Sequence, residues 1–339
     1  MRLLVQPNAY PLPNMKMTMK GFRMSVPKIC SRFSQQAGLV LALAVGLSAA
    51  ARAADTGKTF ATPEEAVSAL VAATSAHSSA GLHALFGAAA AAEFQNPDRV
   101  QATNEFHTFT TALQASHRLV HESATKCVLE LGADAWPFPV PIVKKDGRWF
   151  FDAEAGTEEL LNRRIGKNEL AVLKAMRGYV GAQREYASRD RNSDEVLEYA
   201  QRLGSTPGTK DGLYWPLELD GEVSPLGPMV ADAQSEGYDL GTKGQNNTRE
   251  PFHGYRFKIL TCQSKNAPGG KYSYLINGRM IGGFALVAWP AEYEQSGIMT
   301  FIVNQQGRVY QKDLGPKTAK LAAAMKVYDP DSSWTLSPD

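Results

Sequence analysis

The sequence predicts a protein of the α+β class, in which short helices and strands are followed by one long helix and a second antiparallel sheet. Three patterns lead to this prediction. Helix-capping residues open short apolar repeats in residues 59–87. An amphipathic stretch, apolar on one face and rich in Lys and Arg on the other, covers residues 157–189. Short β-rich runs separated by turn residues fill residues 255–312, and helices and strands segregated in this way are typical of α+β proteins.

Residues 1–53 have the order of a secretory signal peptide. Basic residues precede the apolar run "GLVLALAVGL" at 38–47, and small residues follow it up to Ala53. The run is shorter than the roughly 20 residues that a membrane span needs, and its flanks favour a signal over a buried core helix. A start at Met24 would give a signal of ordinary length. We therefore expect a protein exported to the periplasm or the extracellular space, without a transmembrane anchor after cleavage.

The net charge depends on this leader. The whole chain has 36 Lys and Arg against 34 Asp and Glu, a net charge of +2. Residues 1–53 hold seven of the basic residues and no acidic one, so the remainder has 29 basic and 34 acidic residues, a net charge of −5. Such a chain lacks the basic surface that nucleic-acid binding requires, and we expect no nucleic-acid partner.

Two cysteines follow the leader, Cys127 and Cys262. In an oxidising compartment they could form one disulfide, but their spacing does not show whether they lie close together. Two buried free thiols are the alternative, because a chain of this size can bury a core without a disulfide.

Residues 54–153 are predicted to form a first α+β domain. A capping-box pattern with proline at the first helical position opens "TPEEAVSAL", and a second short helix ends at Gly87. A third helix is expected over 98–121. Strands follow in "KCVLELG" and on both sides of the Asp146–Gly147 turn. Helices followed by a sheet that ends in "KKDGRWFFD" resemble the nuclear-transport-factor-2-like superfamily, and this resemblance implies a pocket between helices and sheet.

Residues 154–339 are predicted to form a second α+β domain around the long helix. A loop-rich insertion is expected over 205–254, because Gly, Pro and Asn are frequent there. A short helix over 316–326 closes the chain. The strand at 298–304 is apolar on both faces, which predicts a central strand covered on both sides, with the long helix on one of them. The predicted strands of this domain are 255–261, 272–276, 283–289, 298–304 and 308–312.

The order of elements in this second domain resembles the globular part of type IV pilins and pseudopilins. The resemblance rests on "NELAVLKAMRGYVGAQREYA" as the helix and "TFIVNQQGRVY" as the last hairpin. The hydrophobic half-helix and the prepilin cleavage site of those proteins are missing. The resemblance therefore implies a pilin-like body that cannot assemble the usual filament spine.

Several long motifs spread over the chain are similar to those of a bacterial secreted family catalogued as domain of unknown function 2950. They include "FATPEEAVSAL", "NRRIGKNEL", "PFHGYRFKILT", "NGRMIGGFALVAWPAEY" and "YDPDSSW". The resemblance implies a location in the cell envelope or outside the cell, and it brings no known activity.

Two patterns could bind a metal. Asp190, Asn192 and Asp194 alternate as calcium-loop ligands do, although Glu195 stands where such a loop has Gly and Gln201 where it has a bidentate Glu. A solvated turn after the long helix is the alternative. We expect no cofactor, and Ca²⁺ bound at this loop is the alternative to that expectation.

His117 and His121 are the second pattern. They are spaced to share one face of the predicted helix, which also contains His107. They could begin a zinc site, but a third ligand is needed. Partly exposed histidines at a helix end are the alternative.

The chain has no Gly-x-Ser-x-Gly elbow and no recognisable cysteine-nucleophile signature. Glu292 and Glu294 could form an acid pair, but they lie in a predicted hairpin turn, where exposed charges are expected. Aromatic residues in loops offer a candidate contact surface for proteins or glycans, unless their prolines pin them to the core. The members of this candidate surface are Trp215, Trp289 and Tyr293.

These observations favour an exported, non-enzymatic protein that acts through protein or glycan contacts in the bacterial cell envelope. The alternative is a periplasmic ligand-binding protein or a hydrolase that uses a pocket in the first domain. Trp136, His117 and Asp134 are the residues to test for that alternative.

Overall fold

The computed structural model describes residues 57–87, 96–219, 221–238 and 251–338. Within them the protein is an α+β fold, as predicted. The predicted signal peptide lies outside the described residues. In the described part of the chain, no helix combines the length and the apolar character that crossing a membrane would require.

The first part of the chain packs three helices on an antiparallel sheet with the strand order β1-β2-β4-β5, in which β3 also pairs with β2. Leu70, Leu113, Leu129 and Phe151 belong to the hydrophobic cluster of this part, which we call the first core. The helices are α1 (Pro63–Ser75), α2 (Ser79–Phe86) and α4 (Arg99–Ala115). The strands are β1 (His117–Ser123), β2 (Lys126–Leu131), β3 (Trp136–Pro137), β4 (Ile142–Lys145) and β5 (Arg148–Phe151).

The predicted start of α1 is confirmed. Thr62 is the N-cap, and its Oγ1 accepts a hydrogen bond from the Glu65 backbone N–H at 3.2 Å. The Glu65 carboxylate reaches back to the backbone N–H of Ala61 at 2.9 Å, one residue before the usual partner in a capping box.

The predicted helix over 98–121 is wrong at its C-terminal end. α4 ends at Ala115, Ser116 is extended (φ −165°), and His117 begins β1. Residues 117–121 pair antiparallel with residues 127–131, and these ladder hydrogen bonds override the helical spacing of the preceding apolar residues.

The long helix α5 (Ala153–Tyr186) is confirmed, although it begins four residues before the predicted start. Asp152 caps it, with Oδ1 accepting from the Ala155 N–H at 3.2 Å. Near the N-terminus of α5, Leu160 packs against the first core. From Val172 to Tyr186, α5 contributes to a different hydrophobic cluster, which we call the second core.

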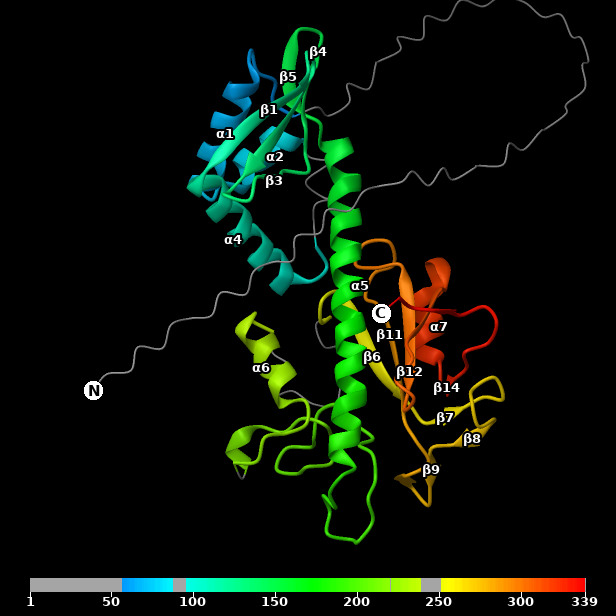
Figure 1. Ribbon diagram of the computed structural model, residues 1–339. Helices are drawn as coiled ribbons and strands as arrows, with labels where there is room; N and C mark the ends of the chain where they lie inside the picture. Colours follow the sequence, from blue (N-terminus) through cyan, green and yellow to red (C-terminus); the bar gives the residue numbers. More distant parts are fainter. Residues whose placement is uncertain (1–56, 88–95, 220, 239–250, 339) are drawn as a thin grey trace, which may run out of the picture. The chain divides into compact units, whose positions relative to one another are not determined.

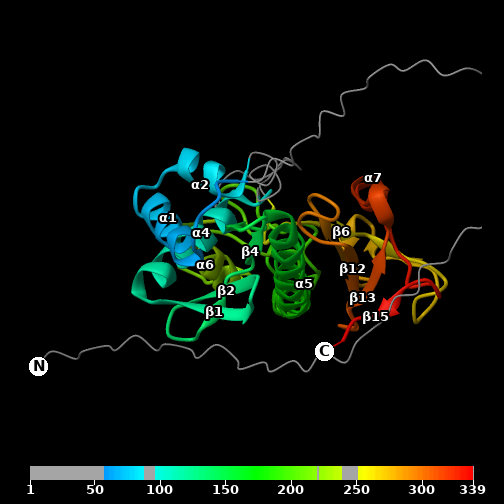
Figure 2. The same ribbon diagram turned by 90° about the horizontal axis from the view of Figure 1, so that it is seen from above.

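The second core lies on an antiparallel sheet with the order β15-β13-β12-β11-β6. β11 and β12 are almost completely buried, which confirms the prediction of a central strand at 298–304. α5 covers one face of this sheet, and α7 (Thr318–Ala324) lies on the other (Figures 1 and 2). The strands are β6 (Tyr255–Leu260), β11 (Ala285–Pro290), β12 (Met299–Asn304), β13 (Tyr310–Asp313) and β15 (Thr335–Leu336).

Shorter elements complete this part. The strand predicted over 272–276 is interrupted at Tyr274, whose N–H donates to the Thr261 carbonyl. The insertion predicted as loop contains α6 (Gly227–Ser235) and the 3₁₀ turn η1 (Leu217–Leu219). The remaining elements are β7 (Cys262–Gln263), β8 (Tyr272–Ser273), β9 (Leu275–Ile276), β10 (Arg279–Met280), η2 (Gly315–Lys317) and β14 (Val327–Tyr328).

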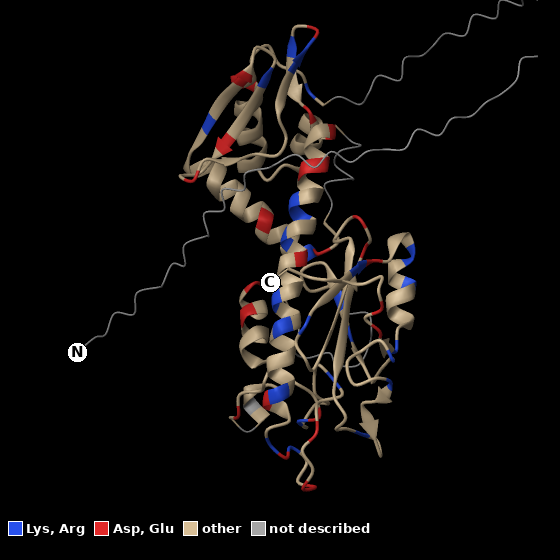
Figure 3. Cartoon of the chain, turned by 45° about the vertical axis from the view of Figure 1, so that its right-hand side comes forward, with Lys and Arg blue, Asp and Glu red and all other residues tan. Residues whose placement is uncertain are grey.

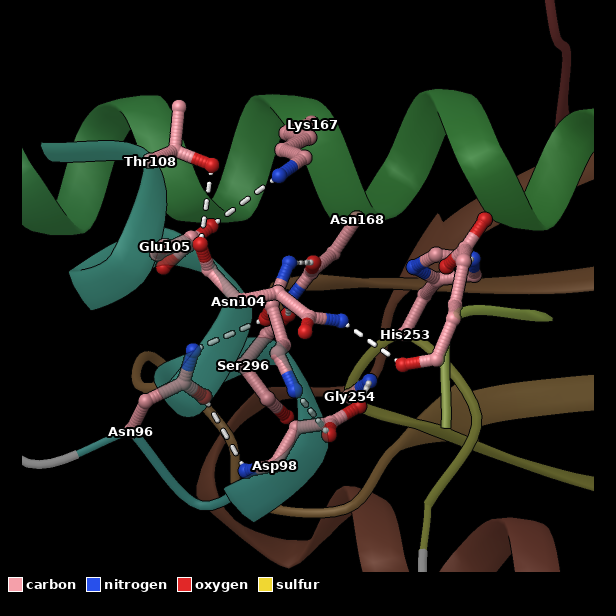
Figure 4. A network of polar contacts seen from close by, with 12 residues as sticks. Asn96, Asp98, Asn104, Glu105, Thr108, Lys167, Asn168, His253, Gly254 and Ser296 are labelled. Carbon is pink, nitrogen blue, oxygen red and sulfur yellow. Dashed lines mark hydrogen bonds and ion pairs between the residues drawn. The ribbon is translucent and has the colours of Figure 1, made fainter. Parts of the chain in front are cut away.

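A buried carboxylate connects segments that are far apart in the sequence (Figure 4). Asp98, only 1% exposed, caps α4 through a hydrogen bond from the Gln101 N–H to Oδ1 at 3.0 Å. Its Oδ2 accepts from the Tyr238 hydroxyl at 2.7 Å and from the Gly254 N–H at 3.0 Å. Burying a carboxylate is tolerated only when its oxygens are hydrogen-bonded, so these three donors are needed together.

The network continues into α5. Gln101 Nε2 donates to Asn168 Oδ1 at 2.7 Å, and Asn168 Nδ2 donates to the Ser296 carbonyl at 2.8 Å. Asn168 is completely buried, so each of its hydrogen bonds replaces one that water cannot make. We call Asp98, Gln101, Asn168, Tyr238 and Gly254 the Asp98 junction.

We predict that Gly254→Ala destabilises the protein more than Gly278→Ala. Both glycines have left-handed backbones, with φ of 71° and 80°, so each substitution costs about 1–2 kcal/mol of backbone strain. A methyl group at Gly254 would also lie 2.6 Å from Asn168 Nδ2 and 2.8 Å from Ser296 Cβ, whereas nothing lies within 4 Å at Gly278. Urea unfolding should show an additional loss of ~1–3 kcal/mol for Gly254→Ala. Equal losses in the two variants would contradict the tight packing of the junction.

Candidate functional site

A cavity of about 750 Å³ lies beyond the C-terminal end of α5. Its lining comes from Tyr186 at the end of α5, from the loop that follows, and from residues within 198–202 and 208–211. We call it the α5 cleft. Its volume is within the range of pockets that hold small ligands. Figure 3 shows Lys and Arg at intervals along α5 and charges of both signs in the loops beyond its end.

The last turns of α5 hold the loops of the cleft in place. The buried Gln183 makes two hydrogen bonds to one loop residue, because Nε2 donates to the Ala200 carbonyl at 2.8 Å and Oε1 accepts from the Ala200 N–H at 2.9 Å. The Tyr186 hydroxyl donates to the Lys210 carbonyl at 2.7 Å. Burial raises the pKa of Tyr186 to about 12, so its phenol stays protonated and keeps this hydrogen bond at neutral pH.

A tight turn follows α5. The Asp190 carboxylate accepts hydrogen bonds from the backbone N–H groups of Glu195 at 2.7 Å, Ser193 at 2.8 Å and Asn192 at 3.2 Å. These bonds, the one from Glu195 first, hold the pKa of Asp190 below its usual value. Glu195 has a left-handed φ of 64° at the position where a calcium loop has Gly.

The other oxygens of the predicted calcium loop contact donors of the chain itself. Asn192 Nδ2 donates to Asp194 Oδ2 at 2.8 Å and to Glu198 Oε1 at 3.1 Å. Arg279 forms an ion pair with Asp194 at 2.7 Å. In the portions of the chain that the structure describes, no group of three or more His, Cys, Asp or Glu is placed to hold a metal ion. Calcium binding at Asp190, Asn192 and Asp194 therefore stays a prediction without support from this geometry.

A charged cluster borders the cleft around Glu222. Its carboxylate contacts Arg191, Lys210 and, at 3.1 Å, Arg189. Hydrogen bonds from Lys210 and then from Arg191 hold the pKa of Glu222 below its usual value, so it is ionised at neutral pH. The Arg191 guanidinium and the Lys210 ammonium also lie 5.1 and 5.4 Å from the centre of the Trp215 ring, which favours cation–π attraction.

Asp211 is held in a similar way inside the cleft. It accepts from the Thr206 N–H at 2.6 Å, the Thr206 hydroxyl at 2.7 Å and the Thr209 hydroxyl at 2.9 Å. Burial alone would raise the pKa of Asp211, but these hydrogen bonds outweigh it and the pKa is lowered. Arg202 lies 3.8 Å from Asp211 and donates to the Thr206 hydroxyl at 2.9 Å.

The candidate aromatic contact surface is not supported at Trp215 and Trp289. Trp215 is 1% exposed and Trp289 is 5% exposed, so both belong to the second core and cannot present their rings to a partner. Tyr293 is half-buried, and its hydroxyl donates to Asp313 at 3.2 Å. Glu292 and Glu294 are exposed, as expected for this turn. The prolines of "YWP" and "AWP" therefore accompany core residues rather than a contact surface.

Of the two alternatives for the cysteines, the structure has the free thiols, because Cys127 and Cys262 are not joined by a disulfide. Cys127 is buried in β2 within the first core. Cys262 lies in β7, where its Sγ contacts the Lys326 carbonyl at 3.4 Å. The two residues belong to different sheets, which the linear spacing could not reveal.

The structure brings His121 and Cys127 together. Cys127 Sγ lies 3.2 Å from His121 Nδ1, and His121 Nε2 lies 4.0 Å from the Glu64 carboxylate. This is the order of a nucleophile, a base and an orienting acid. Burial first, and then the charges of Glu64 and Glu122, raise the pKa of Cys127, so the sulfur is a protonated thiol that water does not reach. The contact was not predicted from the sequence, because residues 117–121 were expected to be helical, whereas they pair with residues 127–131.

The remaining candidates of the predicted first domain do not form one site. His117 Nδ1 lies 2.9 Å from the Leu113 carbonyl and is thus directed toward the end of α4. Trp136 is 43% exposed and is covered by the Arg163 guanidinium at 5.2 Å. Asp134 lies in an exposed turn. None of these three residues lines the α5 cleft.

Comparison with known protein families assigns this α+β protein to one family. A family model described as "Protein of unknown function (DUF2950)" matches residues 57–336. The chain belongs to this family. Searches among curated proteins and among solved structures find no match, and the likenesses to pilins and to nuclear-transport-factor-2-like domains stay predictions.

We predict that Glu222→Gln reduces the acid sensitivity of the protein. A carboxylate whose pKa is lowered in the folded state stabilises that state above its ordinary pKa of 4.5, and this contribution is lost as the pH falls through the lowered value. The variant should be less stable than the wild type at neutral pH and approach it in acid. Urea unfolding at a series of pH values measures this. Glu158→Gln, on an exposed position of α5, is the control, and parallel wild-type and Glu222→Gln curves would contradict the prediction.

Proposed function

We propose that this protein is exported to the bacterial cell envelope and acts there by binding a polar ligand in the α5 cleft, not by catalysing a reaction. The signal-like order of residues 1–53 supports export. The α5 cleft supports binding. We assign the ligand to this cleft instead of to the first-domain pocket that the sequence suggested.

The observation that carries the proposal is that hydrogen bonds within the chain hold the polar groups of the cleft in position. The Asp211 carboxylate is fixed by Thr206 and Thr209, and the backbone of Ala200 is fixed by Gln183. The Arg191 side chain is 6% exposed, and its guanidinium lies 5.6 Å from the centre of the Tyr186 ring and 5.1 Å from that of Trp215. A site whose groups are already ordered loses little conformational entropy when a ligand binds.

The same contacts make two carboxylates at the cleft poor general acids for hydrolysis. A carboxyl group that acts as a general acid must be protonated near the working pH, which requires a raised pKa. Asp211 and Glu222 have lowered pKa values instead. Asp211, which lines the cavity, can orient a ligand as an acceptor, but neither carboxylate is suited to donating a proton to a leaving group.

A hydrolase remains the second candidate, favoured by the alignment of Cys127, His121 and Glu64. That function would require the buried Cys127 to become accessible and ionised. Turnover that is abolished by Cys127→Ala and retained in Cys262→Ala would establish it.

We predict that a bulky residue in the cleft abolishes ligand binding. The protein would be purified from the cell envelope, where its first residue should be Ala54, and screened by thermal shift against envelope saccharides, peptides and metabolites. A ligand that shifts the wild type in a saturable manner should not shift Gln201→Trp, because Gln201 lines the cleft. Gln306→Trp, in the exposed turn between β12 and β13, should respond as the wild type does. An equal response of both variants would contradict the proposal, and so would recovery of uncleaved protein from the cytoplasm alone.

A further inference from the structure

The α5 cleft presents a hydrogen-bond donor beside an acceptor, where Arg202 Nε lies 3.8 Å from Asp211 Oδ2. The Glu198 carboxylate offers further acceptors. Asn192 Nδ2 donates to Glu198 Oε1 at 3.1 Å and to Asp194 Oδ2 at 2.8 Å, so both N–H groups of that amide are engaged within the chain. Arg202, Asp211, Glu198 and Asn192 line the cavity. Arg202 and Asp211 keep 48% and 44% of their side chains exposed, so a ligand can reach both.

The Arg202–Asp211 pair is suited to a group that donates and accepts at neighbouring atoms, and the Glu198 carboxylate is suited to a donor. A hydroxyl carries one donor and two acceptor lone pairs. Two hydroxyls on adjacent carbons can therefore give one hydrogen bond to the Asp211 carboxylate and accept another from the Arg202 guanidinium beside it. A carboxylate ligand offers acceptors only, and an ammonium ligand offers donors only, so each would leave half of such a pair without a complementary partner.

The charges near the cleft also favour an uncharged ligand. Arg202 faces Asp211, Arg191 contacts Glu222, and Arg279 pairs with Asp194. Each of these cations has a carboxylate of the chain within ion-pair distance. A ligand with its own net charge would have to compete with one of these partners.

An aromatic ring lies beside these polar groups. Tyr199 lines the cavity and is half-buried. Its position is fixed by an edge-on contact with Phe284, with 4.8 Å between the ring centres. A rigid aromatic ring next to paired polar groups can cover the apolar C–H face of a sugar ring while the hydroxyls are bound at its edge.

We propose that the ligand class of the α5 cleft is an uncharged saccharide, whose adjacent hydroxyls are recognised by the Arg202–Asp211 pair and by the Glu198 carboxylate. This inference rests on the proposed binding function. It assigns the chemistry of the ligand to three named side chains and makes Tyr199 the residue that covers the sugar ring.

The test is an NMR titration of ¹⁵N-labelled protein without its leader, with maltotriose, cellotriose and chitotriose as probes. At least one trisaccharide should shift amide signals of residues 186–211 in a saturable manner. Its affinity should change little between low salt and about 0.5 M NaCl, because salt screens interactions between charges and not hydroxyl contacts. Glu198→Gln and Arg202→Gln should each weaken binding about tenfold, since each removes a charged hydrogen-bonding partner.

Glu158→Gln and Arg184→Gln are the matched controls, because both residues lie on α5 outside the cleft lining and are exposed. They should bind the trisaccharide as the wild type does. If none of the three trisaccharides shifts a cleft signal, the inference is wrong. If sodium glutamate or inorganic phosphate binds instead, in a manner that depends on salt and on Arg202, the cleft remains a binding site and only the saccharide assignment is overturned. If no probe binds and Gln201→Trp also leaves every thermal shift unchanged, the proposed function is wrong as well.

Discussion

The buried Asp98 carboxylate is the constraint on which the arrangement of this protein depends. It has lost its water, so each of its hydrogen bonds must come from the chain, and the three donors are Gln101 in α4, Tyr238 and Gly254. The N-terminus of α4 adds a favourable dipole. Since Gln101 also holds Asn168 of α5, a displacement of α4 would leave several buried polar groups unpaired. A network of this kind favours one arrangement over near alternatives.

The Asp98 junction affects the α5 cleft through α5, because this helix contributes residues to both. Asn168 fixes the middle of α5, and Tyr179, Gln183 and Tyr186 lie in about the last two turns of the helix, which ends at Tyr186. Tyr179 contacts the Ala285 carbonyl of β11 at 3.4 Å, whereas Gln183 and Tyr186 bind the backbone of the cleft loops. One rigid helix thus connects the sheet to loops that have little regular structure of their own. A binding site on loops needs such support if its polar groups are to stay in position.

Local patterns were sufficient to predict much of the fold, but they could not predict the site. The N-cap of α1, the Asp146–Gly147 turn and the long helix depend on residues close in sequence, and all three were found, although the long helix begins four residues before its predicted start. His117 and His121 share a side in either a helix or a strand, because a spacing of four fits both, so only pairing with β2 decides between them. The Asp98 junction joins residues 140 and 156 positions apart. No periodicity encodes such a contact, and the cleft that α5 supports was therefore missed.

Hydrogen exchange measured by mass spectrometry in increasing urea tests the role of Asp98 most directly. α1 reports on the first core and β11 on the second. If the Asp98 junction couples the two cores, α1 and β11 should lose protection at the same urea concentration in the wild type. In Asp98→Ala they should lose it at different concentrations, because the unpaired Tyr238 hydroxyl and Gly254 N–H weaken the connection between them. Simultaneous loss in the variant, at the urea concentration of the wild type, would contradict this account.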